Sequence, residues 1–236
     1  MAWPPSVLDD FTGSDGSING RVIGAYTWVA PFFTGNAAAT IVSNALAGNN
    51  TQDREGALTT AIGPDVQVAV TIPAGTWVPG GAGDLTMTLF ARVQGTPPLN
   101  PATATFYDIK TNSITGDNDS ILVRVIVAGT TSVVLEQDIG TEWGAGDAFG
   151  AELVEEGGGT RIRVYRKPSA GAWSELGNVL DTTVGRPTTA GLVGLALYNP
   201  ALGFTMDDFS MADLEAPVPG AGDNPPIGIS GRGAGW

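Results

Sequence analysis

The sequence predicts an all-β protein built as an antiparallel two-sheet sandwich, and three observations lead to this prediction. Gly (34 residues) and Pro (16 residues) are abundant, which suits many short strands joined by tight turns. Several segments alternate between apolar and polar residues, the period-two pattern of a strand buried on one face. No window of eleven or more residues free of Gly and Pro has apolar residues at helical spacing, so we expect helices to be minor.

The alternation is clearest at 66–72 and 85–93, where every second residue is apolar. Further strand candidates are separated by breaks rich in Gly, Pro and Asn. They are 21–28, 39–46, 105–110, 121–128, 131–139, 148–154, 160–167, 192–198 and 204–211. The sequence therefore predicts about twelve strands.

Two pairs of neighbouring strands are predicted to form hairpins. Gly129-Thr130 joins 121–128 to 131–139, and Gly157-Gly158-Gly159 joins 148–154 to 160–167. Sequential hairpins imply antiparallel sheets, and two stacked sheets bury the apolar faces of this many strands.

The chain divides into a short N-terminal extension (1–6), one sandwich domain (7–214) and a C-terminal arm (215–236). The last segment, EAPVPGAGDNPPIGISGRGAGW, has four prolines and few residues that could pack. It can be a floppy terminus. Alternatively, neighbouring subunits hold it as an assembly arm, with Ile227, Ile229 and Trp236 as apolar anchors.

Composition excludes several classes of function. The chain has no Cys and no His, so Ser-His-Asp and Cys-His catalytic sites and His-ligated zinc sites cannot be built. The formal charge of −13 repels nucleic acid and anionic membranes. The start, MAWPPSVLDDF, lacks the features of a signal peptide, and no apolar run is long enough to span a membrane. We therefore expect folding in the cytoplasm, no nucleic-acid partner and no membrane insertion.

Three segments resemble a known family. They are LDDFTGSDGSINGR at 8–21 followed by Trp28, TRIRVYRKPSAGAWSELGNVLDTT at 160–183, and TAGLVGLALYNPALGFTMDDFSM at 189–211. Together they resemble the concanavalin A-like (laminin-G-type) jelly-roll domains in tail proteins of phages that infect actinobacteria.

This resemblance implies a non-enzymatic virion structural protein, a minor tail protein that acts in assembly or in recognition of host-surface glycans. A capsid decoration protein of the same particle is a near variant, and a carbohydrate-binding module outside a virion is the alternative. The implied partners are other virion proteins, copies of the chain itself and a host glycan. The implied location is the virion.

Two similar motifs lie at the ends of the domain, Asp9-Asp10-Phe11 and Asp207-Asp208-Phe209. If the first and last strands pair, the sandwich is closed and both phenylalanines enter the core. The four aspartates would then meet, and calcium takes such oxygen ligands. Solvent and turn hydrogen bonds also explain the four aspartates and are the preferred explanation, so calcium is an option and no cofactor is required. Asp117, Asn118 and Asp119 form a denser oxygen cluster, which a turn explains.

Many jelly rolls of this type are glucanases with a Glu-x-Asp-x-x-Glu pattern on one strand. The nearest text, ELVEE at 152–156, lacks the Asp two residues after Glu152. We therefore expect no hydrolase activity and no catalytic residues.

The strand at 160–167 is predicted to carry a cationic and aromatic strip. Arg161, Arg163, Tyr165 and Lys167 share one face, and Trp173 follows on the adjoining hairpin. This strip can bind an acidic partner or a sugar ring. It can also be a solvated edge strand that its charges protect from pairing. Three other tryptophans, Trp3, Trp77 and Trp143, also have two interpretations. Each indole can stack on a sugar or cap the core.

Overall fold

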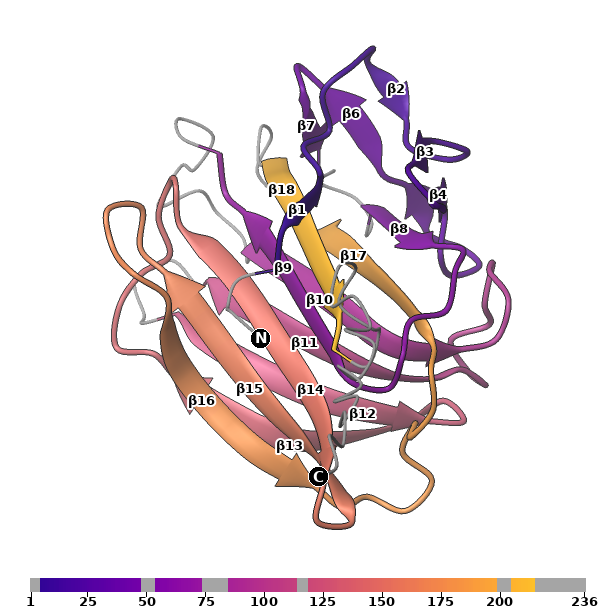
Figure 1. The fold of residues 1–236 in the computed structure, drawn as a ribbon, viewed down its shortest axis with the longest axis vertical. Helices are drawn as coiled ribbons and strands as arrows, with labels where there is room; N and C mark the ends of the chain where they lie inside the picture. Colours follow the sequence, from indigo (N-terminus) through magenta and orange to yellow (C-terminus); the bar gives the residue numbers. More distant parts are fainter. Residues whose placement is uncertain (1–4, 48–53, 74–84, 114–118, 199–204, 215–236) are drawn as a thin grey trace, which may run out of the picture.

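The computed structural model describes residues 5–47, 54–73, 85–113, 119–198 and 205–214. These residues form two stacked nine-stranded sheets and no helix (Figure 1). Consequently, the part of the chain that the structure describes contains no helix that could cross a membrane. The predicted all-β, two-sheet class is confirmed.

The first sheet has the strand order β16-β15-β14-β9-β18-β7-β6-β2, and β1 also pairs with β18. Its strands are β1 (Val7–Asp9), β2 (Gly16–Ser17), β6 (Thr40–Val42), β7 (Ala45–Ala47), β9 (Val66–Thr71), β14 (Ala148–Glu156), β15 (Gly159–Lys167), β16 (Ser174–Asp181) and β18 (Thr205–Asp213).

The second sheet has the order β13-β12-β11-β10-β17-β8-β4-β3, with β5 paired in parallel to β8. Its strands are β3 (Val22–Ile23), β4 (Tyr26–Val29), β5 (Ala37–Ala38), β8 (Arg54–Leu58), β10 (Leu85–Gln94), β11 (Thr105–Ser113), β12 (Ser120–Val127), β13 (Thr130–Asp138) and β17 (Leu192–Tyr198). All other pairings in the two sheets are antiparallel.

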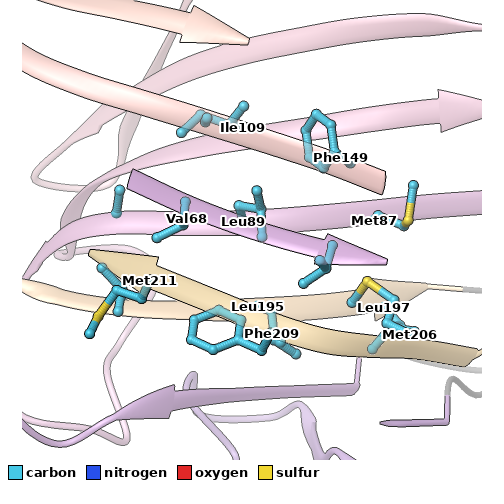
Figure 2. Packing of buried hydrophobic residues seen from close by; sticks show 14 of the residues in the cluster. Val68, Met87, Leu89, Ile109, Phe149, Leu195, Leu197, Met206, Phe209 and Met211 are labelled. Carbon is cyan, nitrogen blue, oxygen red and sulfur yellow. The ribbon is translucent and has the colours of Figure 1, made fainter. Parts of the chain in front are cut away.

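The main core fills the space between the sheets. Val68, Phe149 and Phe209 point inward from the first sheet and meet Leu89 and Leu195 of the second (Figure 2). Four of them come from strands in which every second residue is apolar, as expected when successive side chains face opposite sides, whereas β18, the strand of Phe209, has a register irregularity.

Both predicted hairpins are present. Ala128-Gly129 turns β12 into β13, and Gly157-Gly158 turns β14 into β15, with positive φ at all four residues. Two central residues with positive φ form the turn that matches the twist of antiparallel strands. The first turn lies one residue earlier than predicted.

Two predicted strands are wrong, because each is itself a hairpin. Segment 21–28 is β3 and β4 reversed at Gly24, and 39–46 contains β6 and β7 reversed at Ser43-Asn44. Ser43 and Asn44 have φ of 53° and 61°, a conformation that Asn adopts more readily than most residues. The described residues contain eighteen strands in all, whereas the sequence predicts about twelve.

The sequence prediction also missed β8. Its residues REGAL include an Arg, a Glu and a Gly, and Glu55, Gly56, Ala57 and Leu58 are all buried. A strand that is covered on both faces shows no alternation, so the pattern could not reveal it.

The predicted pairing of the two Asp-Asp-Phe motifs is confirmed. Asp9 of β1 lies opposite Phe209 of β18. Phe11 and Phe209 are fully buried, and their ring centroids lie 5.9 and 5.1 Å from that of Trp28. The predicted arm residues Ile227, Ile229 and Trp236 lie outside the described residues, as do Trp3, Trp77, Asp117 and Asn118.

Candidate functional site

The outer face of the second sheet carries a smaller apolar cluster of its own. Phe90 and Phe106 project from β10 and β11, and two loops bring Phe32, Phe33 and Leu99 over them. The loops are joined by backbone hydrogen bonds from Thr34 N–H to Leu99 O and from Leu99 N–H to Phe32 O, both 2.8 Å. The cluster therefore builds a fixed wall on one part of this face.

A pocket of about 410 Å³ lies beside this wall. This volume is within the range of about 300–1,000 Å³ that is usual for small-molecule sites. The lining residues combine aromatic, charged and hydroxyl side chains. They are Phe33, Asn36, Glu55, Thr86, Thr88, Phe90, Pro101, Phe106, Asp108, Lys110, Arg124, Ala196 and Tyr198.

Strand register explains why these side chains meet. Alternate residues of β11 share a face, so Phe106, Asp108 and Lys110 line the pocket while Tyr107 and Ile109 enter the main core. Asp108 lies opposite Phe90 on β10 and opposite Arg124 on β12. Lys110 lies opposite Thr88.

An ion pair forms part of the pocket lining. Arg124 Nη2 donates to Asp108 Oδ2, and the Asp108 side chain is only 6% exposed. Asp108 Oδ1 and Arg124 Nε are buried without a hydrogen-bond partner among the described residues. Buried polar atoms are almost always paired, so these two atoms are unsatisfied hydrogen-bonding groups of a pair whose side chains line the pocket.

Glu55 supports the pocket from β8. It is almost fully buried, and its Oε1 accepts a hydrogen bond from the backbone N–H of Phe33. This bond fixes the loop that carries Phe33 and Asn36 against the sheet. Lys110, Asn36 and Tyr198 are half-buried, so they present polar groups and one aromatic ring to solvent at the pocket.

The predicted cationic strip is present, but ion pairs neutralise two of its cations, Arg161 and Arg163. Arg161, Arg163, Tyr165 and Lys167 share the outer face of β15, as expected. Arg163 Nη1 lies 2.5 Å from Glu152 Oε1, and Arg161 Nη2 lies 3.2 Å from Glu156 Oε1. Glu152 also accepts a hydrogen bond of 2.7 Å from Gln67.

The alternative of a protected edge strand is wrong, because β15 lies between β14 and β16. Arg166, another basic residue of β15, is buried on the other side of the strand. Its Nη2 lies 2.5 Å from Asp147 Oδ2, and its guanidinium lies 4.8 Å from the centroid of Trp143. Trp143 is itself buried and edge-on to Phe149, so it caps the core.

The predicted calcium ligands lie close together, but they are largely used by the protein itself. Asp9 is buried and accepts from Arg21 Nε (3.0 Å), Arg21 Nη2 (2.9 Å) and Trp28 Nε1 (2.8 Å). Asp10 accepts from the backbone N–H and hydroxyl of Thr12. Asp207 accepts from the N–H of Asp208.

Burial raises the pKa of Asp207 to about 6, and the nearby charges of Asp208, Asp10 and Asp9 add to this rise. Nevertheless, the described residues hold no group of three or more carboxylates that could bind a metal ion. Asp9 in particular does not fit a calcium site, so calcium binding by the four aspartates stays a prediction.

Residues from two of the predicted sites, the cationic strip and the aspartate motifs, line one smaller pocket. They are Lys167 and Trp173, from the strip, and Asp208, from the aspartate motifs. Arg161, Arg163 and Tyr165 lie outside that lining. None of these predicted residues lines the larger pocket.

Sequence reasoning therefore missed the residues of the larger pocket. One signal was present: Arg124 is the sole charged residue of SILVRVIV at 120–127. A lone charge in an otherwise apolar strand requires a partner or a function. The opposing strand offers Asp108 between Tyr107 and Ile109, but the register that joins them could not be read from the sequence.

No protein-family model matches the sequence, and no curated protein matches it. Solved structures do match. One is the legume lectin-like domain from Entamoeba histolytica, with a TM-score of 0.50 and 7% identity over 80% of this chain and 90% of that one. Another is the Emp47p carbohydrate recognition domain, with a TM-score of 0.50 and 12% identity over 86% of this chain and 92% of that one.

The fold is a lectin-like jelly roll. The jelly-roll part of the family resemblance is thereby confirmed. The phage-tail part stays a prediction, because these likenesses concern the fold. Within this lectin-like jelly roll, the larger pocket lies on the outer face of the second sheet, formed by β8, β10, β11, β12 and β17.

Proposed function

We propose that this chain binds glycans in the pocket on the outer face of the second sheet. The observation that carries the proposal is the partly buried Asp108–Arg124 pair, which lines a pocket with aromatic walls and keeps one acceptor and one donor unsatisfied. A sugar ring offers adjacent hydroxyls, each of which can donate and accept. Asp108 Oδ1 would accept from one hydroxyl, and Arg124 Nε would donate to another.

The apolar side of the pocket suits the other part of a sugar. Phe33, Phe90 and Phe106 form its wall, and Tyr198 presents a half-buried ring. Aromatic rings pack against the C–H face of a pyranose while the hydroxyls reach polar groups. The likeness of the fold to a carbohydrate recognition domain makes glycans the first class of ligand to test.

We infer binding and not hydrolysis. The lining carboxylates, Glu55 and Asp108, stand on β8 and β11, which are three strand spacings apart in the sheet. Their backbones are therefore separated by about 14 Å, whereas the Glu-x-Asp-x-x-Glu pattern of jelly-roll glucanases holds its carboxylates on one strand. Asp108 is also bound to Arg124, and Glu55 to the N–H of Phe33.

A glycan array followed by calorimetric titration of the best ligand tests the proposal. We expect Asp108→Asn to weaken binding by about tenfold or more, because it removes the charge that accepts the ligand hydroxyl. Glu152→Gln is the matched control, since it breaks an ion pair on the outer face of the other sheet and should leave affinity unchanged. Thermal melts confirm that both variants fold. A negative array, or wild-type affinity in Asp108→Asn, would overturn the proposal.

We also propose, from the family resemblance, that the chain is a virion protein of a tailed phage. The proposal rests on the three segments that resemble tail proteins, two of which form the paired ends of the domain, β1 and β18. Mass spectrometry of purified particles should detect the chain, and its absence from them would contradict this role.

The assembly arm is part of the same proposal. A chain that ends after Leu214 should fold normally and fail to enter particles, if Ile227, Ile229 and Trp236 bind neighbouring subunits. Normal incorporation of the truncated chain would refute the arm.

A further inference from the structure

A second hollow, of about 160 Å³, lies on the outer face of the first sheet, on the opposite side of the sandwich from the glycan pocket. Its lining comes from the N-terminal segment, the four neighbouring strands β15, β14, β9 and β18, and the loop after β15. The residues are Pro5, Val7, Ala69, Val70, Thr71, Ala148, Lys167, Trp173, Asp208 and Ser210.

Small side chains create the hollow. Ala148 on β14 stands between Thr71 on β9 and Lys167 on β15 in one row across the sheet. Ala69 lies two residues before Thr71 and faces the same side. Because two alanines occupy the floor, larger side chains on either side rise above it.

The two sides of the hollow differ in chemistry. Lys167 and Trp173 come from the end of β15 and the loop that follows it. Asp208 and Ser210 come from β18, beside Val7 of β1. A cation and an indole therefore stand on one side, and a carboxylate and a hydroxyl on the other.

Lys167 and Asp208 differ from the other charged residues on this face. Arg161, Arg163 and Glu152 are held in ion pairs. The Lys167 ammonium and the Asp208 carboxylate have no ion pair and no side-chain hydrogen bond in the described parts of the chain, and both line the hollow. Both of these uncommitted charges therefore line the same hollow.

We propose that this hollow is a second carbohydrate site, which takes a single pyranose ring. The indole of Trp173 offers an apolar surface for the C–H face of the ring, Lys167 donates to ring hydroxyls, and Asp208 accepts from them. The volume is below the roughly 300 Å³ at which drug-sized sites begin, so one ring enters and the rest of a glycan stays outside. The site does not depend on the pocket in the second sheet.

Two sites on opposite faces would make the protein bivalent. A polyvalent glycan surface bound through one face would leave the other face open to a second chain. Opposite faces of one molecule cannot both rest on one flat surface, so the two sites would instead bridge glycans of two separate molecules.

The test uses the full-length protein labelled with 5-fluorotryptophan and observed by fluorine NMR. The resonance of Trp173 is assigned by its loss in Trp173→Phe. Methyl glycosides of glucose, galactose, mannose and N-acetylglucosamine are then titrated one at a time. Each glycoside stands for both the terminal residue of a glycan and the free sugar. We expect one of them to shift the Trp173 resonance.

Variants separate this site from the larger pocket. Lys167→Met and Asp208→Asn should each weaken the response by about tenfold. Asn tolerates the positive φ of 48° at position 208, so the second variant keeps the backbone. Arg161→Gln, on the same strand and face but outside the hollow, should leave the response unchanged, as should Asp108→Asn.

Two results would overturn the second site. One is that no glycoside in the panel shifts Trp173. The other is that the shift disappears in Asp108→Asn, which would assign all binding to the larger pocket. If the glycan array is negative while a glycoside still shifts the Trp173 resonance, the proposed function is refuted and the second site is supported.

Discussion

The outer faces of the two sheets use their side chains in opposite ways. On the first sheet, a row that includes Gln67, Glu152 and Arg163 joins neighbouring strands through hydrogen bonds and an ion pair. On the second sheet, aromatic rings and two loops cover part of the face, and the Asp108–Arg124 pair beside them keeps unused polar atoms. Where charges satisfy one another, as in this row, a surface has little to offer a ligand. Hydrogen-bonding capacity that is left over beside an apolar wall, as in the larger pocket and in the hollow at Lys167 and Asp208, is what a ligand needs.

The largest expected difference between the faces concerns stability. Phe90→Ala should lower the free energy of unfolding by about 3 kcal/mol or more, because the ring is buried against Phe32, Phe33 and Phe106. Tyr165→Ala, on the half-exposed surface of the first sheet, should cost less than about 1 kcal/mol. Urea denaturation measures both, and equal losses would contradict the contrast.

Asp207 is an exception on the first sheet, since burial and neighbouring carboxylates raise its pKa to about 6. Between about pH 4 and 6 the folded chain therefore binds more protons at this group than the unfolded chain does, so this contribution to stability falls as pH rises through that window. Asp207→Asn should remove the fall and stabilise the protein at pH 7 by about 1 kcal/mol, a figure reduced for the partial exposure of the group. Denaturation at pH 4 and pH 7 tests this, and an unchanged pH slope in the variant would sink it.

A smaller effect is expected for the paired charges of the first sheet. Glu152→Gln should lower the free energy of unfolding by about 0.5 kcal/mol, because partly exposed ion pairs contribute little. The loss should shrink further in 1 M salt, which screens such pairs. A large loss that is independent of salt would show that this face depends on its ion pairs as a core depends on packing.

The smallest expected effect is that of calcium. Asp9 is held by Arg21 and Trp28, so we expect the melting temperature to be the same with millimolar calcium and with chelator. A rise with calcium would restore the calcium site predicted at the two Asp-Asp-Phe motifs.

Local rules allowed much of the fold to be predicted from the sequence. Period-two alternation identified the inward residues of β9 and β10, and positive-φ glycines marked two hairpins. The ion pair between Glu152 and Arg163 could also have been predicted from the sequence. A two-residue turn at Gly157-Gly158 fixes the register that sets Glu152 opposite Arg163.

The larger pocket could not be predicted from the sequence, because it depends on contacts between segments that are distant in the chain. Phe33 and Leu99 come from loops far apart in the chain, and Glu55 stands on a strand with no alternation. No tight turn fixes the register between Asp108 and Arg124, since the segment between β11 and β12 is longer than a two-residue hairpin turn. Sequence patterns report what a strand buries, and they report its neighbours only when a short turn joins them.

The positions of β17 and β18 also govern how the protein is made. β17 lies between β8 and β10, and β18 lies between β7 and β9, so in both sheets the last strands separate earlier parts of the chain (Figure 1). A ribosome that has not passed residue 192 has produced strands that cannot yet complete either sheet. Until then their unpaired edges stay exposed, and such long-range closure is slow. The nascent chain should therefore need chaperone protection for most of its synthesis, and assembly of both layers should begin together near its end.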